Sequence, residues 1–134
     1  MRLALCNEVL QPMPFAQQCA WAAAVGYAGL ELAPFTLSDE PHRMIAQERA
    51  AIRGAATDAG IASTGVHWLR RAPKGLSITS PDDAVRARTV EVMRRLVELC
   101  AELGGRVLVH GSPGQRAIPP GETRRIELSY TQAL

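Results

Sequence analysis

The 134-residue chain falls within the roughly 100–200 residues of a typical domain, so one compact unit is expected. Apolar residues make up 47% and charged residues 21%, which excludes a disordered chain and a membrane protein. The net charge of +2 offers no electrostatic basis for binding nucleic acid or anionic lipid. Because the N-terminus lacks the ~7–15-residue apolar core of a secretory signal, we expect a cytoplasmic protein with a small-molecule partner.

The first predicted unit is a strand followed by a helix. Residues 3–6 are apolar and are followed by Asn7 and Glu8, as expected for a buried strand that ends in polar residues. The Ala-rich residues 15–25 predict a helix, with Trp21 in its core face, and Gly26 can end it in the left-handed conformation.

The same unit repeats twice. Residues 29–34 predict a second strand, and a second helix is expected from Pro41 to Ala59. Residues 61–68 predict a third strand. Ser80 is the expected N-cap of a third helix, with Pro81 at its first position.

The third predicted helix carries an apolar stripe as far as Leu103, and residues 106–110 predict a fourth strand. One helix between each pair of strands is typical of right-handed crossovers in a parallel sheet. The predicted fold class is therefore α/β, with a (βα)3β arrangement over residues 1–113 and an irregular tail over residues 114–134.

The three cysteines, Cys6, Cys19 and Cys100, are widely separated and lie in apolar surroundings without a C-x-x-C pair. This pattern is typical of reduced core cysteines. The alternative, a catalytic thiol, requires a nearby histidine that sequence spacing alone does not reveal.

Four segments carry a family resemblance: LCNE at residues 5–8, GYAGLELAP at 26–34, GVHW at 65–68 and VHGSP at 109–113. They resemble the xylose-isomerase-like superfamily, and specifically its bacterial sugar phosphate isomerase/epimerase members. The resemblance implies an eight-stranded TIM barrel, which needs ~250 residues, so the chain corresponds to the N-terminal half. We expect a truncated barrel or an out-of-frame ending, because the tail does not continue the family pattern.

The resemblance also implies the chemistry of the intact family, which is isomerisation or epimerisation of a sugar or sugar phosphate. A divalent metal (Mn, Mg, Zn or Co) polarises the carbonyl, and two Glu exchange a proton with the adjacent carbon. Most of these catalytic residues belong to strands five to eight, which this sequence does not contain. Whether this chain is itself an enzyme, and whether it binds a metal, is therefore left open.

Candidate site residues follow from the position of active sites at the carboxyl ends of barrel strands. By this rule, Asn7 and Glu8 at the end of the first strand face the mouth of the barrel. The substrate-binding candidates are Glu31, His67, Trp68, His110 and Ser112. Of these, His67 and His110 are also candidate metal ligands, as similar histidines are in the related apurinic-endonuclease branch. A structural ion pair for Glu31, a structural role for either histidine and an ordinary turn at residues 111–114 are the alternatives.

Two other functions remain open at this stage. An open four-stranded sheet exposes an edge and an inner face, so the chain could be a non-catalytic half barrel that forms a homo-oligomer. The other alternative is a metal-dependent apurinic endonuclease, which the small net charge disfavours.

Overall fold

The structure is a computed structural model that describes residues 1–67, 69, 71–111, 114, 117–118 and 121. Its four-stranded parallel sheet has the order β1 (Ala4–Cys6), β2 (Gly29–Leu32), β3 (Ala62–Val66) and β4 (Val107–Leu108). The strands are shorter than the apolar runs predicted from the sequence, but their sequential parallel order confirms the (βα)3β arrangement of a partial barrel.

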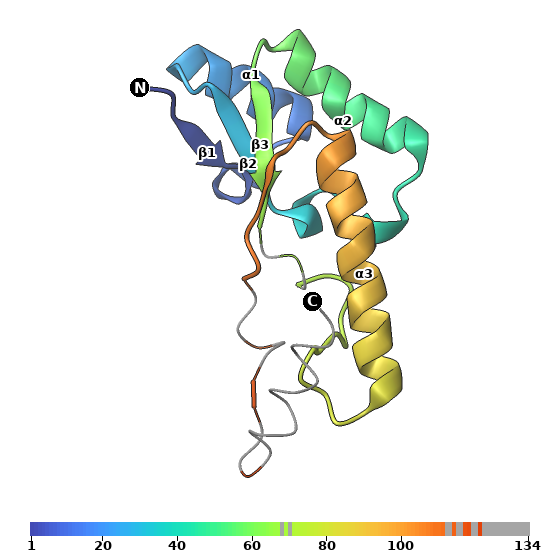
Figure 1. The fold of residues 1–134 in the computed structure, drawn as a ribbon. Helices are drawn as coiled ribbons and strands as arrows, with labels where there is room; N and C mark the ends of the chain where they lie inside the picture. The colour runs from blue at the N-terminus through green and yellow to red at the C-terminus, as the bar shows by residue number, and fades with distance from the viewer. Residues whose placement is uncertain (68, 70, 112–113, 115–116, 119–120, 122–134) are drawn as a thin grey trace.

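Three helices connect consecutive strands and lie on the same side of the sheet (Figure 1). They are α1 (Phe15–Val25), α2 (Ala46–Asp58) and α3 (Asp83–Glu102). The bounds of α1 agree with the sequence prediction, and Gly26 ends it with a φ of 96°, in the left-handed region that favours glycine.

The second helix begins later than predicted. Pro41 opens a short 3-10 helix, η3 (Pro41–Arg43), and the backbone is then extended at Ile45, so α2 starts at Ala46. The carboxylate of Glu48 accepts a hydrogen bond from the backbone N–H of Ile45 at 2.8 Å. Proline at the first position suits a 3-10 turn as well as an α-helix, whereas the Glu48 contact satisfies a free N–H at the real helix start.

The prediction that Ser80 caps the third helix is also wrong. Asp82 is the N-cap, and its Oδ1 accepts a hydrogen bond from the N–H of Ala84 at 2.8 Å. Ser80 instead accepts from the N–H of Asp82 at 3.1 Å, in the turn before the helix. Asp82 satisfies a free N–H of the first turn and places a carboxylate at the positive end of the helix dipole, which is consistent with α3 starting at Asp83.

The hydrophobic core lies between the helices and one face of the sheet. Its members include Leu30, Leu32 and Val66 from the strands and Leu96 from α3, each at most 1% exposed. Trp21 was predicted to be helix core, but it is 41% exposed. The small residues of α1 face the sheet instead, which allows the helix to pack closely against β2.

The opposite face of the sheet carries the side chains that alternate with the core residues. Cys6 pairs with Glu31, Glu31 with Gly65, and Gly65 with Val107 in the parallel ladder, so these positions share that face. A Cβ at Gly65 would collide with the carbonyl oxygen of Val107. Glycine is therefore required in the GVHW segment because β3 and β4 approach closely there.

Candidate functional site

The carboxyl ends of β1, β2 and β3 bring together four side chains: Cys6, Glu8, Glu31 and His67. Cys6 ends β1, Glu8 lies in the 3-10 helix η1 (Asn7–Leu10) directly after it, and Glu31 lies in β2. His67 follows β3, and its backbone N–H donates to the carbonyl oxygen of Leu32 at 3.0 Å. Extension of the ladder by this bond fixes the position of the imidazole next to β2.

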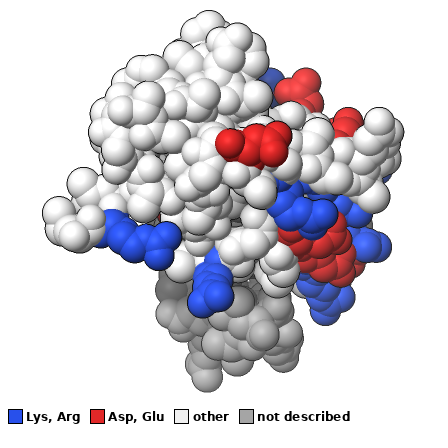
Figure 2. Space-filling model, turned by 90° about the horizontal axis from the view of Figure 1, so that it is seen from above, with Lys and Arg blue, Asp and Glu red and all other residues white. Residues whose placement is uncertain are grey.

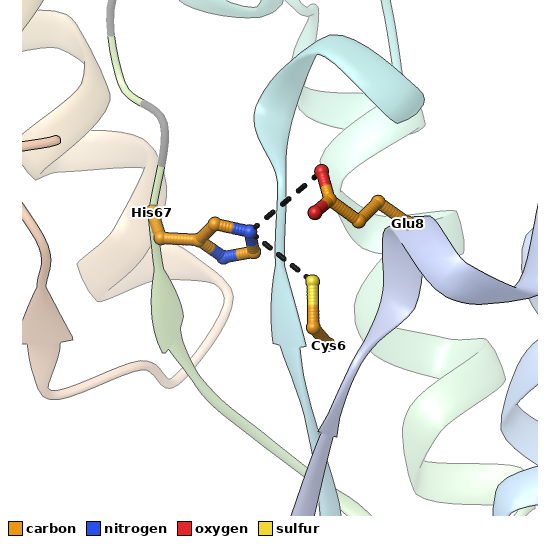
Figure 3. A group of neighbouring side chains, drawn as sticks. All are labelled: Cys6, Glu8 and His67. Carbon is orange, nitrogen blue, oxygen red and sulfur yellow. Dashed lines mark hydrogen bonds and ion pairs between the residues drawn. The ribbon is translucent and has the colours of Figure 1, made fainter. Parts of the chain in front are cut away.

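His67 is the centre of this group, and Figure 3 shows it pointing towards Cys6 and Glu8. Its Nε2 lies 3.1 Å from Sγ of Cys6 and 4.0 Å from Oε2 of Glu8. Its Nδ1 lies 3.6 Å from Oε2 of Glu31. The two ring nitrogens therefore face different partners, a thiol and a carboxylate on one side and a second carboxylate on the other.

Burial differs between the histidine and its partners. His67 is 7% exposed, whereas the side chains of Glu8 and Glu31 are each 34% exposed. Among the described residues, Nδ1 of His67 is a buried nitrogen without a hydrogen-bond partner. The arrangement therefore combines a buried imidazole with two neighbouring carboxylates that remain partly accessible to a ligand.

Cys6 differs from the other two cysteines. Cys19 and Cys100 are fully buried in the core, as predicted, and burial raises the pKa of the Cys19 thiol to about 11. Cys6 is only partly buried. Burial is also the main cause of the raised pKa of Cys6, and the nearby charges of Glu8 and Glu31 raise it further.

The sequence analysis placed Glu8 at the mouth of the barrel, at the end of the first strand, but it did not place Cys6 in the candidate site. The signal was present in the strand alternation, since Cys6 follows Leu5 and so lies on the face opposite the core. The missing information was the register, which pairs Cys6 with Glu31 and brings both beside His67. The alternative role of a catalytic thiol requires a nearby histidine, and Cys6 has His67 as its neighbour.

Asn7 was a candidate for the mouth of the barrel because it ends the first strand, but it lies in the interior. Its side chain is 0% exposed and accepts from the N–H of Ala33 at 2.7 Å. Its amide also donates to Gln18 at 3.2 Å and to Thr36 at 2.7 Å. These bonds link the ends of β1 and β2 to α1, so Asn7 holds the site's framework in place.

The remaining predicted site residues are placed differently. His110 follows β4, is half-buried and is not part of the group around His67. Trp68 and Ser112 lie outside the described residues, as does most of the tail. The binding roles predicted for these residues stay predictions.

Charged side chains of both signs are interspersed on the face shown in Figure 2, and much of that face is uncharged. This distribution agrees with the small net charge of +2. None of the helices within the described residues has the length and apolar character needed to cross a bilayer.

Comparison with known families places this geometry in context. A profile of the xylose isomerase-like TIM barrel family matches residues 19–132, which is most of the chain. The fold and the site at the carboxyl ends of its strands define a partial α/β barrel. The chain belongs to the xylose isomerase-like TIM barrel family.

Two solved structures have the same fold over nearly the whole chain. The first is 3-keto-D-glucoside 4-epimerase YcjR from E. coli in its apo form, with a TM-score of 0.69 and 14% identity; the match covers 99% of this chain and 49% of that one. The second is D-psicose 3-epimerase in the presence of D-fructose, with a TM-score of 0.69 and 20% identity; the match covers 98% of this chain and 47% of that one. A comparison with curated protein sequences gives no match.

The chain therefore spans about half the length of the solved epimerases that it resembles. The family profile extends beyond residue 113 into the region that the sequence analysis sets apart as a tail. The boundary predicted between residues 113 and 114 stays a prediction.

Proposed function

We propose that this chain forms the N-terminal, substrate-binding half of a cytoplasmic sugar or sugar phosphate isomerase/epimerase barrel. The observation that carries the proposal is the pair of Glu31 and His67 at the carboxyl ends of adjacent strands, where barrel enzymes bind substrate. Both solved structures with this fold are sugar epimerases by name, which supports a sugar as the ligand class.

The two side chains are suited to binding sugar hydroxyls. A carboxylate accepts hydrogen bonds from two hydroxyls at once, and a neutral imidazole both donates and accepts. Because Glu31 is partly exposed and lies 3.6 Å from the buried His67, a ligand at the mouth can reach the carboxylate more readily than the imidazole. By resemblance, Trp68 would cover the apolar face of the sugar, and His110 and Ser112 would contact it from the next strand.

In the intact family, a divalent metal would supply a Lewis acid for proton transfer next to the substrate carbonyl. The carboxylates that hold this metal and move the proton belong, by resemblance, largely to strands five to eight. The residues of this chain therefore bind and orient the substrate in this proposal, and proton transfer depends on the other half of a barrel.

A ketose is the first ligand to test, because D-fructose accompanies one of the structural neighbours. We expect the chain to bind D-fructose or its 6-phosphate, and Glu31→Gln and His67→Gln to weaken binding at least tenfold. Loss of a hydrogen bond to a charged group costs about 1.5–3 kcal/mol, which is roughly a tenfold or greater change in affinity. Isothermal titration calorimetry of the folded variants measures this directly.

Two control variants separate the site from general effects of substitution. Glu98→Gln removes an exposed carboxylate of α3 that pairs with Arg95, and His42→Gln removes a histidine of η3 outside the group around His67. Both should bind the ketose as the wild type does. Equal weakening by all four variants, or no ketose binding by the wild-type chain, would count against the proposal.

A second candidate function is that of a half barrel that associates with itself. Val107 lies in β4, at an edge of the described sheet, and Val109 directly follows this strand; they are 53% and 45% exposed. Exposed apolar residues on a sheet edge favour pairing with another chain. This observation favours a homo-oligomer and is independent of the sugar-binding residues.

We expect the V107K/V109K double variant to shift the chain towards monomer in sedimentation velocity experiments, because lysine on an edge strand opposes pairing. The matched control is V25K, since Val25 is 56% exposed at the end of α1, away from the sheet edge. A wild-type chain that is already monomeric at high concentration would rule out this second function.

A further inference from the structure

We propose that Cys6, Glu8 and His67 form a site for a thiophilic divalent cation of the zinc type, with Glu31 orienting the histidine. The three ligand atoms lie within 4.8 Å of one another. The site is made by β1 and β3, so it differs from the carboxylate-rich metal site that the family resemblance assigns to strands five to eight. It shares His67 and Glu31 with the sugar-binding site proposed above, but its test needs no sugar.

The spacing of the ligand atoms fits a tetrahedral ion. Zinc bonds of about 2.0–2.3 Å at tetrahedral angles separate neighbouring ligand atoms by roughly 3.3–3.6 Å. Sγ of Cys6 and Nε2 of His67 are 3.1 Å apart, and Nε2 is 4.0 Å from Oε2 of Glu8. These two distances lie on either side of the tetrahedral value, and the third pair, Sγ of Cys6 and the Glu8 carboxylate, lies within 4.8 Å, so a cation needs only side-chain rotations to reach its ligands.

The carboxylate of Glu8 lies close to both other ligands. At 4.0 Å its oxygen is beyond hydrogen-bond distance from Nε2 of His67, whereas, besides burial, its hydrogen bond with the Cys6 thiol is one of the contacts that raise the pKa of Cys6. The side chain is also 34% exposed, which leaves it room to rotate towards a cation. A cation between the three ligands would neutralise the negative charges that Glu8 and Glu31 place around Cys6.

Glu31 provides the carboxylate that usually orients a metal-bound histidine. A metal-bound histidine typically donates its other ring N–H to a carboxylate, which fixes the tautomer and the orientation of the ring. Nδ1 of His67 is buried, lacks a hydrogen-bond partner among the described residues and lies 3.6 Å from Oε2 of Glu31. A small shift of Glu31 makes this bond and leaves the lone pair of Nε2 for the cation.

The nature of the ligands selects the cation. Thiolate and imidazole ligands favour Zn²⁺ and Co²⁺ over Mg²⁺ and Ca²⁺, which prefer oxygen ligands. On binding, the Cys6 thiol forms a bond to the cation and its proton passes to the buffer. Three protein ligands leave a fourth position open to an external ligand, as in catalytic rather than structural zinc sites.

Cobalt titration of the whole chain after removal of metals with EDTA tests the site without any sugar. We expect one Co²⁺ per chain, tetrahedral visible absorption and a thiolate-to-cobalt charge-transfer band in the ultraviolet. Cys6→Ser should abolish the charge-transfer band, and Cys100→Ser should retain it. Glu31→Gln should weaken binding by about 10–100-fold, the usual effect of removing a carboxylate that orients a metal-bound histidine.

A measurement on the wild-type chain avoids dependence on variants that fold poorly. Cys6 is the most accessible of the three thiols, so iodoacetamide should alkylate it first, and Zn²⁺ but not Mg²⁺ should protect it. Mass spectrometry of the labelled peptides identifies the modified cysteine. The absence of both zinc protection and a charge-transfer band in the folded chain would overturn the proposal, even if the chain binds a ketose.

Discussion

Replacement of Asn7 by alanine is expected to lower the free energy of unfolding by about 3 kcal/mol, because it leaves buried polar groups without partners. Asn7 is fully buried, and its side chain makes hydrogen bonds to Ala33, Gln18 and Thr36. Of these groups, the N–H of Ala33 is fully buried. Removal of the Asn7 side chain leaves this N–H without an acceptor, which lowers the stability of the folded state. Urea unfolding followed by circular dichroism measures the change.

The matched control for Asn7 is Gln47→Ala, which removes an exposed amide at the start of α2. We expect this control to change stability by less than about 0.5 kcal/mol, as is usual for surface substitutions. If Asn7→Ala is no more destabilising than Gln47→Ala, then Asn7 does not hold the ends of β1 and β2 together. It would then return to the set of possible ligand-binding residues.

The second large effect is expected for Leu96→Ala in α3, with a loss of about 3 kcal/mol within the 2–5 kcal/mol range for buried leucines. Leu96 is 0% exposed and belongs to the core that α3 shares with the sheet. The substitution removes apolar surface from the core and leaves a cavity that the surrounding helices and strands can only partly fill.

Val97 provides the control for Leu96, because it is the next residue of the same helix and is 51% exposed. Val97→Ala should leave stability within about 0.5 kcal/mol of the wild type. Equal stability of the Leu96 and Val97 variants would mean that α3 does not pack on the sheet as described. Both variants use the same urea unfolding measurement.

The fold could be predicted because its main signals are local. The helix α1 is framed by Pro14 and Gly26, and the apolar runs that form the strands are separated by helical stretches. The starts of α2 and α3 could not be predicted as reliably. In each case two residues could begin the helix, and the choice between Ser80 and Asp82 depends on which side chain reaches the free N–H groups.

The candidate site could be predicted only in part for a different reason. Glu31 and His67 are visible in the sequence because a charged or titratable residue in a buried strand requires a partner. Cys6 and Glu8 become part of the group only through the pairing of Cys6 with Glu31 and the turn of η1 after β1. Contacts across 61 residues, such as that between Cys6 and His67, are set by strand register, which composition and spacing do not specify.

The most direct test of the account is the histidine NMR spectrum of the chain during titration with D-fructose. The chain has three histidines, and His42 and His67 belong to different parts of the structure: η3 beside α3 and the carboxyl end of β3. The proposed sugar-binding mouth predicts saturable shifts of the His67 ring signals and unchanged signals from His42. Unchanged His67 signals, or equal shifts at His42, would contradict a sugar-binding site at the ends of these strands.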